Sequence, residues 1–234
     1  MLIYGEPGAG KTYLLGTAED HEDTSPMLLI DIEGGTLTLR RRNIDVVQVR
    51  SMKQIEEVHN EIANDTDRHY KTVGIDSLTE LQKLDMRTVM KETYNRKPDS
   101  TDIYVPSQRE WGKSGERVRM IVRAFRDLPV NTLVTALMSS DKDDRTGQTS
   151  FFPSFPGKLR SEIPGFFDVV GYLTTFNEGN TVHRQLQFAK TQKVIAKDRT
   201  DSLGESMIDP SIPLMWARIT EEERITKEEI NVSS

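Results

Sequence analysis

The chain has 234 residues, with 31 Lys and Arg against 37 Asp and Glu, which gives a net charge of −6. This length is enough for one α/β domain with a sizeable core, and the acidic balance argues against a protein that coats duplex nucleic acid by bulk charge, while leaving room for a local basic groove. The sequence contains no cysteine, which excludes a disulfide framework and thiolate chemistry.

A glycine-rich loop follows the first predicted strand, Leu2 to Tyr4. It reads Gly5-Glu6-Pro7-Gly8-Ala9-Gly10-Lys11-Thr12 and matches the phosphate-binding pattern G-x-x-x-x-G-K-[ST]. Glycines let the backbone curl so that N–H groups point at an anion, and the helix predicted to follow, Tyr13 to Ala18, adds the positive end of its dipole. We therefore predict a nucleotide site from Gly5 to Tyr13, in which Lys11 reaches the β- and γ-phosphates and Thr12 ligates Mg²⁺.

Two later predicted strands end in carboxylates. Met27 to Ile32 carries Asp31 and is followed by Glu33, and the strand from residue 72 to 75 is followed by Asp76. Because the carboxyl ends of parallel strands line one crevice, we expect these side chains to converge near the γ-phosphate. Asp76 is predicted to hold the Mg²⁺ shell, and Glu33 to activate water, with Asp31 as the alternative base. The competing interpretation makes Glu33 an ordinary surface carboxylate.

The remaining elements alternate between strands and helices. Arg40 to Arg42 is interpreted as a solvated face. The helix after Ser51 has a capping box with Gln54. The further expected segments are a strand at 46–49, a helix at 78–93, a loop at 94–107, a helix from 118 to 128, a strand at 132–138, a long polar loop at 139–164, and strands at 169–175 and 185–188 joined by a hairpin turn at 177–180. The pattern predicts an α/β fold with a mostly parallel sheet, flanking helices and an antiparallel edge.

Several stretches resemble the RecA-like recombinase core and, more closely, phage-encoded RecA-like ATPases of the Sak group, which are single-strand annealing proteins. They are GEPGAGKT (5–12), DIEGG (31–35), VGIDSLTEL (73–81), PGKL and IPGFFDVVGYL (within 156–173) and AKDR (196–199). The resemblance implies a RecA-like P-loop core over residues 1–210. The remaining residues, 211–234, are a C-terminal extension whose acidic tail, from Thr220, is predicted from its residues to hold a short helix capped by Thr226 and Glu229. It implies ATP and Mg²⁺ as cofactors, single-stranded DNA as partner, Glu33 as the catalytic glutamate and Asp76 as the metal-site aspartate.

The long loop, 139–164, is the predicted DNA contact. It combines four basic residues with three phenylalanines, a mixture that suits phosphate pairing and base stacking on single strands. The alternative is that the phenylalanines pack under the loop as a satellite core. The basic residues are Lys142, Arg145, Lys158 and Arg160, and the aromatic ones are Phe151, Phe152 and Phe155. A single-strand binding protein is a further expected partner.

Lys197 and Arg199 are two residues apart and would face one side of an extended segment. RecA-like proteins carry a similar basic pair that reaches a neighbour's γ-phosphate, which implies a homo-oligomer; the alternative is an exposed basic edge. Such proteins also assemble through a segment before the core, and nothing precedes Leu2 here, so the chain is either truncated or assembles otherwise. The polar sensor of the family would fall to Thr135 or Ser139.

The phosphate loop predicts a nucleotide-binding protein, and the resemblance implies a Mg²⁺-dependent ATPase, stimulated by single-stranded DNA, that acts in phage recombination or strand annealing. The alternatives are a P-loop kinase of a small metabolite and a non-catalytic nucleotide switch or assembly protein. No apolar run approaches a membrane span and no signal peptide is visible, which predicts a cytoplasmic protein without a membrane partner, in the host cell if the protein is phage-encoded.

Overall fold

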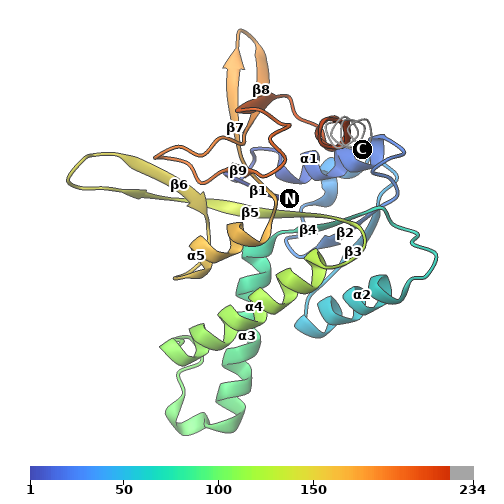
Figure 1. The fold of residues 1–234 in the computed structure, drawn as a ribbon. Helices are drawn as coiled ribbons and strands as arrows, with labels where there is room; N and C mark the ends of the chain where they lie inside the picture. The colour runs from blue at the N-terminus through green and yellow to red at the C-terminus, as the bar shows by residue number, and fades with distance from the viewer. Residues whose placement is uncertain (222–234) are drawn as a thin grey trace, which may run out of the picture.

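The structure is a computed structural model that describes residues 1–221. A mixed sheet runs through its centre, with helices on both faces (Figure 1). The strands are β1 (Leu2–Gly5), β2 (Met27–Asp31), β3 (Asp45–Gln48), β4 (Thr72–Asp76), β5 (Asn131–Lys142), β6 (Thr149–Pro153), β7 (Val169–Glu178), β8 (Thr181–Gln187), β9 (Lys197–Asp198) and β10 (Ser206–Ile208). The helices are α1 (Lys11–Gly16), α2 (Met52–Asn64), α3 (Leu78–Arg96), α4 (Gln108–Arg126), α5 (Leu159–Glu162) and a segment over residues 212–221.

The strand order is β10-β8-β7-β1-β5-β4-β2-β3. Every pair from β7 to β3 is parallel, and β8 and β10 then add an antiparallel edge beside β7. This topology confirms the predicted fold class, a mostly parallel α/β sheet with an antiparallel edge. It also aligns the carboxyl ends of β1, β4 and β2 along one rim of the sheet, so the loops that follow these strands meet there.

The core has two halves because the sheet is buried on both faces. Leu2 and Tyr4 of β1 belong to the hydrophobic cluster that α2, α3 and α4 cover. Ile3 points the other way, as the two-residue period of a strand requires, into the cluster of α1 and the 212–221 helix. A strand buried on both faces reads as an uninterrupted apolar run, which is why the short sequence at 2–4 is recognisable as a strand.

The predicted cap of α2 is confirmed in part. Ser51 accepts from the Gln54 N–H at 3.3 Å, but the Gln54 side chain accepts from the N–H of Arg50 and not of Ser51, so the reciprocal bond of a capping box is not formed. Ser107 and Glu110 form a full capping box that starts α4 at residue 108. The prediction placed the beginning of this helix too late, because the first turns of α4 are polar and carry no apolar stripe.

The segment from 139 to 164 is not the long loop that the sequence predicts. β5 continues to Lys142 and pairs antiparallel with β6, and the hairpin projects from the sheet (Figure 1). Asp143 builds the turn: its carboxylate accepts from the N–H of Arg145 and of Thr146, and Gly147 adopts a φ of 69°. Asp at the start of a turn and Gly at its left-handed position are ordinary hairpin residues, a signal that the overall polarity of the stretch conceals.

The base of this hairpin is tied to the first turn of α3. The Leu137 N–H donates to the Thr79 hydroxyl at 3.0 Å, and the Ser154 N–H donates to the Leu137 carbonyl at 2.7 Å. Farther along, β6 is joined to the segment before β9, since the Phe151 N–H donates to the Lys193 carbonyl at 2.6 Å. The hairpin is therefore fixed at its base and along one side.

The predicted hairpin, with its turn at 177–180, is confirmed. β7 and β8 pair from Tyr172 and Gln187 out to Glu178 and Thr181, with the turn at Gly179 in a left-handed conformation, φ 59°. At the other end of the chain, Ile212 and Met215 are buried against the core. The short helix expected around residues 226–229 lies outside the described residues.

Candidate functional site

The loop between β1 and α1 has the shape that its glycines predict. Gly8 and Gly10 have φ values of 80° and 94°, which favour glycine, and a Cβ on Gly5 would collide with the Leu173 carbonyl of β7. Lys11 lies in the mouth of the loop, where its Nζ donates to the carbonyls of Gly5 at 3.1 Å and Glu6 at 2.9 Å. Residues 5–10 and the first residues of α1 thus curl around a buried ammonium group.

Burial lowers the pKa of Lys11 from its ordinary value, and the carboxylates of Glu33 and Asp76 oppose this shift. Both carboxylates therefore lie within electrostatic range of the amine, as predicted from the strand ends. The arrangement places one cation between the loop and two acids on the same rim, which is where the terminal phosphate of a nucleotide held by the loop would lie.

Asp76 ends β4 and is almost fully buried. Its Oδ2 accepts from the Thr12 hydroxyl at 2.6 Å, and its Oδ1 accepts a short hydrogen bond from the Thr135 hydroxyl. The two residues predicted to hold the metal, Thr12 and Asp76, are thus in direct contact. Of the two sensor candidates, Thr135 is the one at the site, because the Ser139 hydroxyl instead bonds to Ser154.

Asp31 and Glu33 follow from β2, which lies beside β4 with Asp31 level with Asp76. Asp31 is buried, and only its Oδ1 has a partner, the N–H of Gly34 at 2.7 Å; its Oδ2 is buried with no partner among the described residues. Glu33 is exposed, and its N–H donates to the Asp76 carbonyl at 3.3 Å. The two carboxylates therefore differ in environment: that of Asp31 is buried, and that of Glu33 faces solvent at the rim.

These residues fit a hydrated Mg²⁺ ion. Mg²⁺ usually keeps several waters and binds through one or two carboxylates and substrate phosphates, so it does not need a cage of protein ligands. Thr12 and Asp76 would hold it, and Asp31, buried level with Asp76 with an unpartnered Oδ2, would add negative charge beside them. When bound, the ion neutralises charge on the triphosphate.

The basic pair does not lie at this site. β9 pairs with the first residues of β7, and Lys197 is level with Val170, which is itself level with Leu2 at the start of β1. The Lys197 Nζ donates to the Pro164 carbonyl at 3.1 Å, and Arg199 forms an ion pair with Asp168 at 2.9 Å. Both residues lie toward the rim opposite the phosphate loop, and their action on a neighbour's nucleotide stays a prediction.

The phenylalanines of the 139–164 segment pack inward. Phe152 and Phe155 are buried at 5% exposure, and the Phe151 ring stacks on Tyr172 with centroids 5.6 Å apart. Arg160 lies over the Phe152 ring at 3.8 Å and pairs with Asp141. The expectation that Phe152 and Phe155 stack on bases is wrong for this conformation, because apolar rings at the hairpin base find a dry surface against the sheet.

Sequence reasoning missed two arginines at the site. Arg42, assigned to a solvated face, has its side chain mostly buried, with its guanidinium paired to Asp20 and lying 4.7 Å from the ring centroid of Tyr13. Arg184 of β8 lies 4.9 Å from the same centroid. Neither arginine lies in a recognisable sequence motif, and the position of Arg184 depends on the pairing of β8 with β7, which the sequence does not show.

Replacing Thr135 with Val is expected to destabilise the protein by about 1–3 kcal/mol, because it removes a donor from a buried carboxylate and leaves the shape of the side chain unchanged. Chemical denaturation at neutral pH measures this difference. The control is Ser140→Ala on the exposed part of β5, for which a change within about 0.5 kcal/mol is expected. Equal stability of Thr135→Val and the parent would show that the bond to Asp76 contributes nothing.

In the described part of the chain, no helix is both long and apolar enough to cross a bilayer.

A scan against protein-family models matches residues 1–200 to the model AAA_24, described as an AAA domain. A search of curated proteins found no match. Among solved structures, the chain is similar to the KaiC-like protein PH0186 from the hyperthermophilic archaeon Pyrococcus horikoshii OT3, with 14% identity over 89% of this chain and 88% of that chain and a TM-score of 0.48. With the family model spanning residues 1–200 and the phosphate loop, Asp76 and Glu33 at one rim, the chain belongs to the AAA domain family of AAA_24 and is a P-loop ATPase.

Proposed function

We propose that the protein is a Mg²⁺-dependent ATPase that acts with single-stranded DNA in phage recombination or strand annealing, as a homo-oligomer. The observation that carries the hydrolytic part is the convergence of Lys11, Asp76 and the exposed Glu33 at one rim. Turnover of ATP in the absence of any acceptor molecule tests it, since a kinase needs an acceptor. A parent protein that binds ATP without releasing phosphate, with and without DNA, would favour the nucleotide switch.

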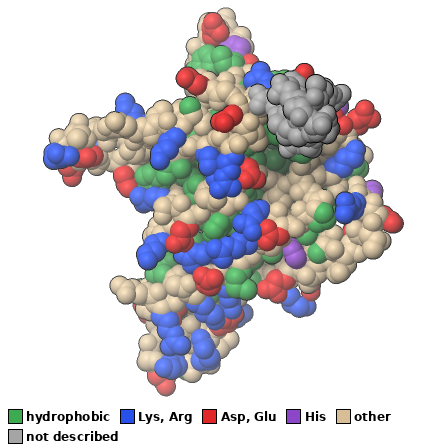
Figure 2. Space-filling model, viewed as in Figure 1, with side chains coloured by type: hydrophobic (Ala, Val, Ile, Leu, Met, Phe, Trp, Pro, Cys, Tyr) green, Lys and Arg blue, Asp and Glu red, His purple; other side chains and the backbone are tan. Residues whose placement is uncertain are grey.

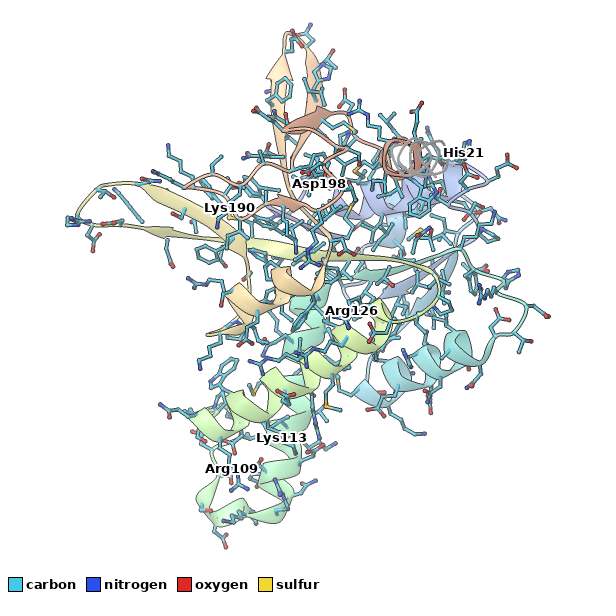
Figure 3. The ribbon with its side chains drawn as sticks, in the orientation of Figure 1. His21, Arg109, Lys113, Arg126, Lys190 and Asp198 are labelled. Carbon is cyan, nitrogen blue, oxygen red and sulfur yellow. The ribbon has the colours of Figure 1, made fainter. Side chains whose placement is uncertain are left out.

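The DNA part is supported by the place of the β5–β6 hairpin. β5 carries Thr135 at the metal site and Lys142 at its far end, so the nucleotide site and the projecting hairpin share one strand. Exposed Lys193 lies against β6 through its carbonyl, and Lys190 lies nearby (Figure 3). Basic and acidic side chains are interspersed over the whole visible face (Figure 2), which agrees with a local contact and not with bulk charge.

Neutralising this basic group is expected to weaken single-strand binding and to flatten its salt dependence, by about 0.7 in the slope of log affinity against log salt for each phosphate that is no longer neutralised. The variant combines Lys142→Gln, Arg145→Gln, Lys190→Gln and Lys193→Gln, and fluorescence anisotropy with a labelled oligothymidine measures binding. The matched control neutralises four exposed cations on α2 and α3: Lys53, Lys83, Lys91 and Arg96. Equal slopes in both variants would show that the hairpin does not bind the DNA.

A further inference from the structure

Arg184 brings a cation from the antiparallel edge of the sheet onto the phosphate loop. It lies on β8, two strands away from β1, yet a Cβ built on Gly10 would collide with its Nε. Its guanidinium carbon is 4.9 Å from the ring centroid of Tyr13, which directly follows Thr12. The side chain thus touches the loop on both sides of Lys11 and Thr12, although it comes from a distant part of the sequence.

This guanidinium has no carboxylate in direct contact among the described residues, unlike its neighbour, although Asp209 lies within electrostatic range. Arg42, which stacks on the same tyrosine, is held by Asp20 through two hydrogen bonds of 2.7 and 2.8 Å. Arg184 forms no ion pair with a described residue, and its Nε is buried without a partner. The neighbouring carboxylate, Asp209, is used differently, because it accepts from the main-chain N–H of Arg184 and contacts the His183 ring.

A buried donor on a charged group is costly when nothing accepts from it, so an unpaired guanidinium at a ligand-binding loop indicates that the ligand supplies the acceptor. Arginine presents planar, paired donors that match the oxygens of a phosphate group, and hydrogen bonds between two charged groups are the strong ones. The phosphates of a nucleotide in the loop are anions of the required chemistry at the required place.

The order of the strands indicates which phosphate of the nucleotide Arg184 contacts. Asp31, Glu33 and Asp76 come from β2 and β4, which lie on one side of β1 with β5 between, whereas β8 lies on the other side beyond β7. The metal and the terminal phosphate belong to the side of the carboxylates. Arg184 lies on the opposite side, next to the residue that follows Thr12, where the phosphates closer to the nucleoside are cradled.

Resting on the proposed function, we propose that Arg184 binds the α- or β-phosphate of the nucleotide within its own subunit, with Tyr13 holding the guanidinium flat. Arg184 is therefore a binding residue for the diphosphate part that ATP and ADP share. Arg42 supports the tyrosine and, because Asp20 neutralises it, contributes little charge to the ligand.

Isothermal titration of Arg184→Gln with ATP, ADP and inorganic tripolyphosphate, each with Mg²⁺, tests this assignment. The affinities for all three are expected to fall together, by about 10- to 100-fold, and Arg184→Lys is expected to recover part of the loss because it keeps the charge. Arg126→Gln, on the exposed end of α4 where Arg126 pairs with Asp127, is the control and should match the parent.

Each other outcome overturns the assignment. Weaker binding of ATP with unchanged ADP would place Arg184 at the γ-phosphate, and unchanged tripolyphosphate would place it at the nucleoside. Parent-like affinity for all three ligands would leave it a structural residue. If Arg184→Gln fails to fold, as judged by thermal unfolding without nucleotide, Arg184→Lys is titrated with the same three ligands instead. Affinities of Arg184→Lys equal to those of the parent for all three ligands would again overturn the assignment. A parent that binds neither nucleotide would refute the proposed function as well, whereas a parent that binds normally confines the failure to this inference.

Discussion

Replacing Glu33 with Gln is expected to lower ATP turnover about 10²–10⁴-fold, the usual scale for a positioned base, while ATP binding is retained. The glutamine keeps the size of the side chain and the main-chain bond to Asp76 but cannot accept a proton. Glu33 suits this work because it is exposed to water at the rim and lies close enough to raise the pKa of Lys11. Phosphate release measures turnover, and calorimetry measures binding.

The control for this experiment is Glu61→Gln, an exposed glutamate on α2 that should leave turnover unchanged. Asp31→Asn is the informative companion. Asp31 is sealed from solvent, so its substitution is expected to weaken the Mg²⁺ dependence of hydrolysis more than the chemical step. If Glu33→Gln turns over ATP at the parent rate and Asp31→Asn does not, Asp31 is the base and Glu33 is a surface carboxylate.

Replacing Lys11 with Ala is expected to remove productive ATP binding. Lys11 is the only side-chain cation that the phosphate-loop motif supplies, and it is buried in the mouth of the loop, where burial lowers its pKa. Losing a charged donor should weaken ATP affinity by at least about 10-fold. Turnover should fall about 10²–10³-fold or more, as when a donor to the developing charge is removed.

Lys53→Ala, an exposed lysine on α2, is the matched control. Circular dichroism must also show that Lys11→Ala is folded, because the substitution leaves the carbonyls of Gly5 and Glu6 without their donor. Undiminished affinity and turnover in the folded variant would mean that nucleotide is bound elsewhere on the protein.

The sequence was sufficient wherever the geometry of the candidate site depends on local structure. The places of Gly8, Gly10 and Lys11 could be predicted because a loop that wraps an anion needs left-handed glycines and a cation at fixed spacing, and the place of Asp76 because it ends an apolar strand. The sequence was insufficient where contacts depend on which strands are neighbours. Arg184 reaches the loop only because β7 pairs with both β1 and β8, and the sequence around residue 184 contains no signal of that contact.

The misplacement of the phenylalanines has a related origin. Phe152 and Phe155 were assigned to DNA because basic residues accompany them in the predicted loop, yet burial of an apolar ring depends on the surface opposite it, which the local sequence does not contain. The position of Lys197 and Arg199 could not be predicted either, because β9 pairs with the beginning of β7 and so places both residues toward the other rim; their action on a neighbour's nucleotide stays a prediction. The spacing of two residues on a strand predicts that their side chains face the same side, but it does not predict where along the sheet the strand is paired.

The unbroken course of β5 sets how far the hairpin tip stands from the nucleotide site. Near the base, Leu137 is hydrogen-bonded to Thr79 at the beginning of α3, and Thr135 is hydrogen-bonded to Asp76. From Thr135 to Lys142 the strand measures roughly 23 Å at the ordinary rise per residue. Because β6 and the segment before β9 brace this stretch, a DNA strand bound at the tip, as in the proposed function, would lie at a set distance from the nucleotide.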